Sequence, residues 1–161
     1  MEDKSSAPAH YMKGCAYVKV ISLLEPWASL VAVGAKHIET RSWATKYRGP
    51  LGIHASKGRK PENMNLAWKE PFYAALESIH REVNGKPSLR YHPGCIISTC
   101  NLVDCLEMTP EFLLNMKSPE LDFGHYEIGR FAWILEDVRR LPEPILAKGK
   151  LGLWEFDHPE S

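Results

Sequence analysis

What this 161-residue sequence lacks already excludes several classes of protein. No run of apolar residues approaches the roughly 20 that a membrane-spanning helix needs. Residues 1–16 are mostly polar and contain no apolar segment typical of a signal peptide. We therefore expect a flexible tail over 1–16, one domain over 17–157, a cytoplasmic location and no contact with a membrane.

Metal-binding patterns are also absent. The four cysteines, at positions 15, 95, 100 and 105, include no C-x-x-C pair, and the seven histidines form no H-x-H or H-E-x-x-H motif. We expect no metal and no cofactor in the fold. If the segment is a strand, Cys100 faces away from Cys95 and Cys105, and all three are ordinary reduced thiols.

The elements that are present indicate a mainly β fold of the α+β class. Short segments rich in β-branched residues alternate with turn signals, and Glu25-Pro26 begins a short helix that Gly34 ends. Thr109-Pro110 begins another short helix. The connections are too short for repeated parallel crossovers, which favours a small β-barrel with flanking helices. Strands are predicted at 17–24, 37–43, 51–56, 95–106, 130–138 and 153–156.

Two further predictions concern prolines and helical spacing. Residues 61–84 are predicted to be helical, with Pro71 dividing the region and Gly85 ending it. The apolar residues of its second half recur at helical spacing: Phe72, Ala75, Leu76, Ile79 and Val83. Pro142 and Pro144 are predicted to separate the last two strands.

Charge is concentrated in one segment of a chain with no net charge. Residues 36–60 hold seven basic side chains and one acidic side chain, which predicts a local anion site. Trp27, Trp43 and Tyr47 lie in or near this segment, and aromatic rings stack on nucleic-acid bases with about 1–3 kcal/mol per base. Arg41 and Arg48 are the arginines beside them. The alternative is a solvated basic face over aromatic residues of the core, Trp27 above all.

The motifs in this segment resemble a known family. Residues 34–41, Gly-Ala-Lys-His-Ile-Glu-Thr-Arg, fit the pattern G-x-K-x-x-E-x-R, with Pro-Trp-Ala-Ser-Leu before it and Tyr-Arg-Gly-Pro-Leu after it. Together with Ile-His-Ala-Ser at 53–56 and Gly-Arg-Phe-Ala-Trp at 129–133, they resemble the ASCH domain of the PUA-like superfamily. The likeness extends over about 18–156 and includes both a coactivator variant and small stand-alone bacterial and phage proteins.

The resemblance implies a β-barrel whose cleft binds RNA, a nucleotide or a nucleoside, with single-stranded DNA as a further ligand class. It also implies candidate hydrolase activity, on the amide of acetylated cytidine or on RNA. The family's catalytic lysine corresponds to Lys36, and Glu39 stands where the amidohydrolases have threonine. A later acidic residue of that branch would be one of three candidates: Glu111, Glu120 or Glu127.

The octet has a chemical interpretation of its own. Lys36 is expected beside the cleft at a helix-to-strand junction, outside the core, where a depressed pKa would let its neutral amine act in catalysis. Glu39 is either the base itself or a partner that stabilises protonated Lys36. Arg41 suits phosphate or a developing oxyanion. The alternatives are an exposed surface lysine and a structural Glu39–Arg41 ion pair on one strand face.

The neighbouring strand ends in His54, Ser56 and Lys57. His54 and Ser56 lie on the same side by the two-residue period. No nucleophile elbow surrounds Ser56, so we expect these residues to hydrogen-bond or to contact phosphate. We predict a monomeric nucleotide- or RNA-binding protein; a binding module without turnover and a protein-interaction adaptor remain the alternatives.

Overall fold

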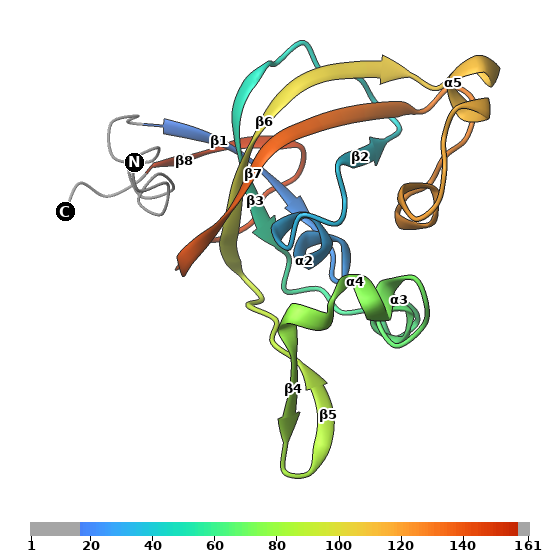
Figure 1. Ribbon diagram of the computed structural model, residues 1–161. Helices are drawn as coiled ribbons and strands as arrows, with labels where there is room; N and C mark the ends of the chain where they lie inside the picture. The colour runs from blue at the N-terminus through green and yellow to red at the C-terminus, as the bar shows by residue number, and fades with distance from the viewer. Residues whose placement is uncertain (1–16, 158–161) are drawn as a thin grey trace, which may run out of the picture.

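The computed structural model describes residues 17–157, so the predicted tail over 1–16 lies outside the described residues. Figure 1 shows a curved sheet with short helices against it and a hairpin that projects away from it. Six strands form the sheet in the order β2-β7-β6-β3-β1-β8. Their bounds are β1 Tyr17–Leu23, β2 Ile38–Arg41, β3 Gly49–Ala55, β6 Cys95–Glu107, β7 Phe131–Leu146 and β8 Leu153–Asp157.

The prediction of a mainly β, α+β fold is confirmed, but the strand pairing found among residues 17–157 does not close a barrel. β2 and β8 are the two edges. Only β1 and β3 pair in parallel, and the other neighbours are antiparallel. A parallel pair needs a crossover connection, which here contains helix α2 (Trp27–Ala32) and strand β2. The predicted octet therefore lies within this crossover.

Helix α2 begins beside a buried carboxylate. Glu25 is 2% exposed and accepts hydrogen bonds from the Ser29 backbone N–H at 3.0 Å and from its hydroxyl at 2.9 Å. The carboxylate thereby satisfies a first-turn N–H that has no partner within the helix. Burial raises the pKa of Glu25 to about 7, although the two bonds from Ser29 act in the opposite direction.

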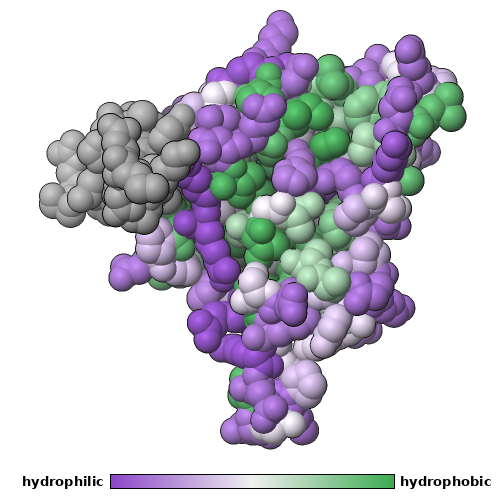
Figure 2. Space-filling model, in the orientation of Figure 1, coloured by the Kyte–Doolittle hydropathy of each residue, from purple (hydrophilic) through white to green (hydrophobic). Residues whose placement is uncertain are grey.

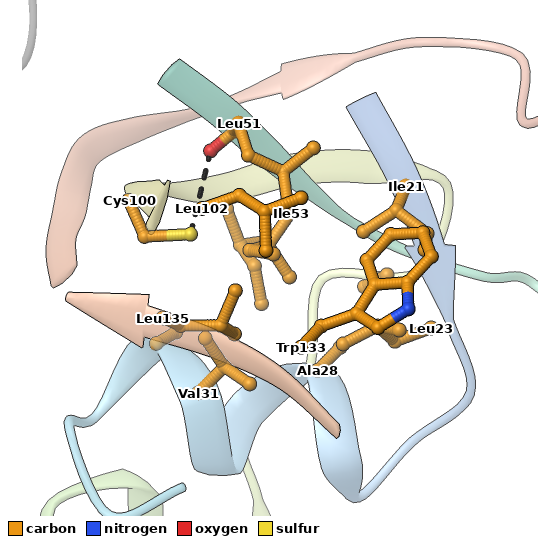
Figure 3. Packing of buried hydrophobic residues seen from close by; sticks show 13 residues of the cluster. Ile21, Leu23, Ala28, Val31, Leu51, Ile53, Cys100, Leu102, Trp133 and Leu135 are labelled. Carbon is orange, nitrogen blue, oxygen red and sulfur yellow. Dashed lines mark hydrogen bonds between the residues drawn. The ribbon is translucent and has the colours of Figure 1, made fainter. Parts of the chain in front are cut away.

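The main core lies between this helix and the sheet. In Figure 3 the Trp133 indole of β7 lies beside Ile21 and Leu23 of β1 and Ala28 of α2. Trp133 is 0% exposed, and Ala28 and Val31 on α2 are also fully buried. The apolar residues of α2 pack in two directions: Val31 lies in this main core, whereas Leu30 and Trp27 belong to a second cluster.

The predicted helix over 61–84 is wrong in its second half. Three short helices, α3 (Pro61–Leu66), α4 (Phe72–Ala75) and the 3-10 turn η1 (Glu77–Ile79), lead into a hairpin of β4 (His80–Val83) and β5 (Lys86–Leu89). Asn84 and Gly85 both have positive φ, 53° and 73°, as an Asn-Gly hairpin turn requires. The hairpin projects from the body (Figure 1), and its surface is mostly hydrophilic (Figure 2).

The apolar spacing over 72–79 nevertheless has a structural cause. Phe72, Leu76 and Ile79 are buried in a second cluster with Leu30 of α2 and Phe123 of the 3-10 turn η2 (Glu120–Phe123). Val83, the last residue of the predicted helical series, lies on the hairpin and is 43% exposed. The periodicity therefore belongs to α4 and η1 only.

Bulges explain two further corrections. β7 continues through Pro142 and Pro144 instead of ending before them, because its pairing with β6 is irregular there. A proline has no N–H to donate and is tolerated at such irregular positions. The bulges in β6 also shift its side-chain alternation, so Cys95, Cys100 and Cys105 all contact the main core, contrary to the prediction for Cys100. These three cysteines are free thiols.

Between β6 and η2 the predicted short helix is confirmed as α5 (Pro110–Leu114). The Thr109 hydroxyl oxygen accepts a hydrogen bond from the Phe112 N–H at 3.1 Å, which is the expected N-cap contact.

Candidate functional site

Lys36 occupies the short link between α2 and β2. Gly34, with φ 81°, reverses the chain after the helix, and the N–H groups of Ala35 and Lys36 both donate to the Leu30 carbonyl. The Lys36 side chain turns inward and is 1% exposed. The prediction that it lies outside the core is therefore wrong, and so is the alternative of an exposed surface lysine.

The buried ammonium group of Lys36 has three polar neighbours. Nζ donates to the carbonyl oxygens of Ile38 and Phe123, the latter at 2.8 Å, and lies 3.8 Å from Glu39 Oε2. Burial lowers the pKa of Lys36, while the negative charges of Glu39 and Glu120 act against that lowering. The predicted direction of the pKa shift is thus present: burial is its largest cause, and the like charge of Arg41 also lowers the pKa.

Glu39 and Arg41 form the same-face ion pair that the strand pattern predicts. Arg41 Nε lies 3.2 Å from Glu39 Oε1, with side chains 24% and 12% exposed. Arg41 Nη2 also donates to the Ser22 carbonyl on β1 at 3.1 Å. Through Arg41, the ion pair connects edge strand β2 to β1.

Of the three later acidic candidates, Glu120 is the one beside Lys36. Its carboxylate accepts the N–H groups of His37, at 3.0 and 3.1 Å, and Ile38, at 2.8 Å. Glu111 is exposed on α5, and Glu127 pairs with His125 at 2.8 Å. Tyr126 contributes a buried hydroxyl without a hydrogen-bond partner among residues 17–157, and burial raises its pKa. Glu120 thus positions the start of β2, which carries Glu39.

A polar cleft opens over these residues, and we call it the Lys36 cleft. It consists of two adjoining pockets of about 320 and 310 Å³ that share Trp27, Glu39, Thr40 and Arg130. Lys36 lines the first pocket, and Arg41 and Trp43 line the second. Both acidic and basic side chains face this cleft, beside the Trp27 and Trp43 indoles. Such a mixture suits a flat polar ring such as a nucleobase.

A larger pocket of about 770 Å³ adjoins the cleft and shares Ser22, Leu24 and Arg41 with it. We call it the loop chamber, because residues 146–152 form one wall. Its charged lining is entirely basic and consists of Arg41, Lys57, Lys148 and Lys150, with His54 and Ser56 as further polar residues. Arg41 therefore stands between an amphoteric cleft and a cationic chamber.

His54 is buried beneath the loop chamber. Nε2 lies 2.8 Å from the Ala147 carbonyl, and Nδ1 lies 3.0 Å from the Ser22 hydroxyl, which also accepts from Trp154 Nε1 at 3.2 Å. One tautomer satisfies this network: Nε2–H donates to Ala147, and Nδ1 accepts from Ser22. Both ring nitrogens of His54 are thereby engaged in hydrogen bonds. His54 therefore supports the loop of residues 146–152 through its contact with Ala147.

The remaining predicted residues are divided between these regions and another face. Ser56 and Lys57 line the loop chamber as well, with Ser56 Oγ 3.3 Å from the Gly58 N–H. Tyr47 packs against the main core and donates to the Pro50 carbonyl. Arg48 lies among neither set of lining residues and instead pairs with Asp104 at 3.5 Å. The structure thus brings eight predicted residues to the cleft and chamber: Trp27, Lys36, Glu39, Arg41, Trp43, His54, Ser56 and Lys57.

Sequence reasoning missed three basic residues that line these pockets. Arg130 lies immediately before β7 and donates to the carbonyls of His125 and Thr40, at 3.0 and 3.4 Å. Its signal was the Gly-Arg-Phe-Ala-Trp segment, which carried the resemblance but no expected role. Lys148 and Lys150 are far outside the basic segment 36–60, and no local pattern relates them to it.

Neither a metal centre nor a membrane span emerges from the described part of the chain. Within residues 17–157, no three His, Cys, Asp or Glu side chains come together in a way that could hold a metal ion. None of the helices there combines the length and the apolar character needed to cross a bilayer.

Comparison of the sequence with known proteins gives matches over most of the chain. The family model described as "ASCH domain" matches residues 21–143. Activating signal cointegrator 1 from Mus musculus is 28% identical over 138 residues, and the Homo sapiens protein is 29% identical over the same length. Each match covers 85% of this chain but 22% of the relative, so the chain spans about a fifth of the relatives' length.

Proposed function

This chain belongs to the ASCH domain family, and from that premise we propose that it binds RNA or a nucleotide in the Lys36 cleft and the adjoining chamber. The observation that carries the proposal is the continuity of the two spaces through Arg41. One space offers indole faces and mixed polar groups, which suit a base, and the other offers four cations, which suit phosphate. We expect a monomeric, cytoplasmic protein, with single-stranded DNA as a weaker candidate ligand.

Catalysis through Lys36 is the second candidate function. Its support is a buried lysine with a lowered pKa that lines a ligand-sized cleft. With two N–H groups engaged by Ile38 and Phe123, the neutral amine would keep its lone pair for a substrate proton. Glu39, 3.8 Å from Nζ, is the alternative base.

The reaction class would be hydrolysis of an acylated exocyclic amine of cytidine, or of RNA. In the amide case, a water oxygen bonds to the acyl carbon while Lys36 or Glu39 takes its proton. The carbon–nitrogen bond then breaks, the amine nitrogen receives that proton, and a carboxylic acid leaves. Arg41 or Arg130 would stabilise the negative charge on the acyl oxygen. Because the amine acts when neutral, turnover should rise with pH through the lowered pKa of Lys36.

The test combines turnover with binding. Acylated cytidine nucleosides and short single-stranded RNAs are incubated with the wild type, Lys36→Met and Lys36→Arg, and the products are identified by mass spectrometry. Methionine keeps the unbranched apolar bulk of the buried chain and removes the amine. It also leaves two carbonyls without their donor, at about 1–3 kcal/mol for a buried group, so thermal melting must accompany each assay.

Four outcomes separate the candidate functions. Product formation by the wild type, lost in folded Lys36→Met, supports hydrolysis through Lys36. Turnover that persists in that variant removes Lys36 from the mechanism. Binding without turnover in the wild type supports a binding module, and absence of binding to every ligand overturns the proposed function in favour of an adaptor that contacts proteins.

A further inference from the structure

The loop chamber has a fixed wall. Ala147 N–H donates to the Gly94 carbonyl at 3.0 Å, and the Ala147 carbonyl contacts His54 Nε2 at 2.8 Å. Gly94 N–H in turn donates to the Ala55 carbonyl at 2.7 Å. The start of the loop is therefore attached to β3 through backbone groups and a buried histidine, although it follows β7 in sequence.

Gly149 brings the loop backbone into direct contact with that histidine. A Cβ added there would lie 2.7 Å from His54 Cε1, closer than real Cβ contacts allow, and at a tight 3.0 Å from Ser22 Oγ. Only glycine permits this approach. Lys148 and Lys150 are exposed and flank Gly149 in the sequence. The contact between Gly149 and His54 therefore determines where the backbone of both lysines lies.

The charged side chains that line the loop chamber are all positive. Lys148 and Lys150 join Lys57 and Arg41 around about 770 Å³, and the lining contains no aspartate or glutamate. The aliphatic chain of exposed Lys57 lies against Gly94, where an added Cβ would meet Lys57 Cε at 2.6 Å. Four like charges around one space repel one another, and a bound polyanionic group relieves this repulsion.

We propose that the loop chamber is a phosphate site, with Lys57, Lys148 and Lys150 holding the phosphate of a nucleotide or RNA strand whose base lies in the Lys36 cleft. The inference rests on the proposed function and sharpens it: a phosphorylated nucleotide is the preferred ligand and binds more tightly than the free nucleoside. Arg41, common to both spaces, would contact the ligand between base and phosphate.

The test compares two pairs of lysine substitutions that remove the same charge. Lys148→Gln/Lys150→Gln changes the chamber, whereas Lys69→Gln/Lys86→Gln changes two exposed lysines outside the cleft and the chamber. Calorimetry measures the affinity of cytidine, cytidine 5′-monophosphate and inorganic phosphate, and fluorescence anisotropy measures a short labelled single-stranded RNA over a range of salt.

The chamber pair should lose about tenfold affinity for the monophosphate and the RNA and keep its affinity for cytidine. The logarithm of the RNA affinity should also depend less steeply on the logarithm of the salt concentration. The slope should fall by about 1.4, because each of the two lost phosphate contacts contributes about 0.7 on a single strand. Gly149→Ala, which keeps both lysines but displaces the loop, should lose monophosphate affinity too. A loss in this variant would show that the positions of the two lysines matter, and not only the net charge of the protein.

Equal losses in the two lysine pairs, or no loss in the chamber pair while the wild type binds the monophosphate, would overturn the phosphate site and leave the proposed function standing. A wild type that binds none of the nucleoside, nucleotide and RNA ligands would overturn the proposed function itself. Inorganic phosphate bound without any nucleotide would assign the chamber to an anion unrelated to nucleic acid.

Discussion

Replacing Trp133 with alanine should destabilise the fold more than any other single change considered for this chain. The side chain is 0% exposed and lies in the main core beside Ile21, Leu23 and Ala28. Its ring centroid is 4.8 Å from that of Trp43 in an edge-to-face arrangement, and its Nε1–H donates to the Trp43 carbonyl at 3.3 Å. Both apolar packing and a polar contact would be lost together.

The magnitude follows from these contacts. Buried tryptophan-to-alanine changes cost about 3–5 kcal/mol, and the aromatic pair accounts for about 0.5–1.5 kcal/mol beyond area. We expect a loss near the upper end, about 4–5 kcal/mol, because the cavity is large and the Trp43 carbonyl loses its donor. For a domain of this size the melting temperature should fall by roughly 10–20 °C.

The assay is urea unfolding followed by circular dichroism, with Trp133→Phe as the control. Phenylalanine keeps an aromatic ring but not the N–H, so it should cost about 1–2 kcal/mol. A double-mutant cycle with Trp43→Ala should give a coupling of about 0.5–1.5 kcal/mol. An alanine variant within 1 kcal/mol of the wild type would refute the assignment of Trp133 to the core.

Three further predictions concern the buried carboxylate of Glu25, the N-cap of α5 at Thr109, and Arg41, which lines both the Lys36 cleft and the loop chamber. The pKa of Glu25 is raised from 4.5 to about 7, so its contribution to stability is complete below pH 4.5 and is lost as the pH rises to about 7. Glu25→Gln should gain roughly 3 kcal/mol over the wild type between pH 4.5 and pH 8 in urea unfolding, and parallel pH profiles would contradict this. Thr109→Ala should cost about 1 kcal/mol in the same assay and Thr109→Ser almost nothing; an equal cost would dismiss the cap. Arg41→Ala should weaken RNA binding by about 10- to 100-fold, as expected for a charged contact, with Arg41→Lys intermediate in anisotropy titrations; equal affinities would exclude Arg41 from the interface.

Local rules predicted the six strands of the large sheet and helix α2 well, because residue type and spacing along the chain carry those signals; they missed β4 and β5. Glu25-Pro26 and Gly34 bracket α2, and the two-residue period placed Glu39 and Arg41 on one face, where they form an ion pair. The helical spacing over 72–79 was also real, but it was extended too far. Gly85 was interpreted as the end of a helix, although Asn84-Gly85 is a strong signal for a hairpin turn between two strands.

The rest of the candidate site depends on contacts between distant segments. A lysine is almost never expected inside a protein, and the burial of Lys36 depends on the Phe123 carbonyl, 87 residues further along the chain. Lys148 and Lys150 reach the chamber because β3 carries His54 to the Ala147 carbonyl, 93 residues away. Bulges in β6, which reverse the side of Cys100, leave no clear trace in the sequence.

The connection between β3 and β6 begins and ends at one point. These strands are direct neighbours, and the Gly94 N–H donates to the Ala55 carbonyl at 2.7 Å, so residues 56–93 leave the sheet and return to the same place. This excursion supplies Leu66 and Phe72 to the Lys36 cleft and covers Leu30. The first residues of this excursion, Ser56 and Lys57, line the loop chamber, whereas Leu66 and Phe72 line the Lys36 cleft. A shorter relative that kept Ser56 and Lys57 but lacked the helices after them would retain the loop chamber and have a more open Lys36 cleft. The middle of the excursion is thus a wall of the cleft whose length can vary without changing the chamber.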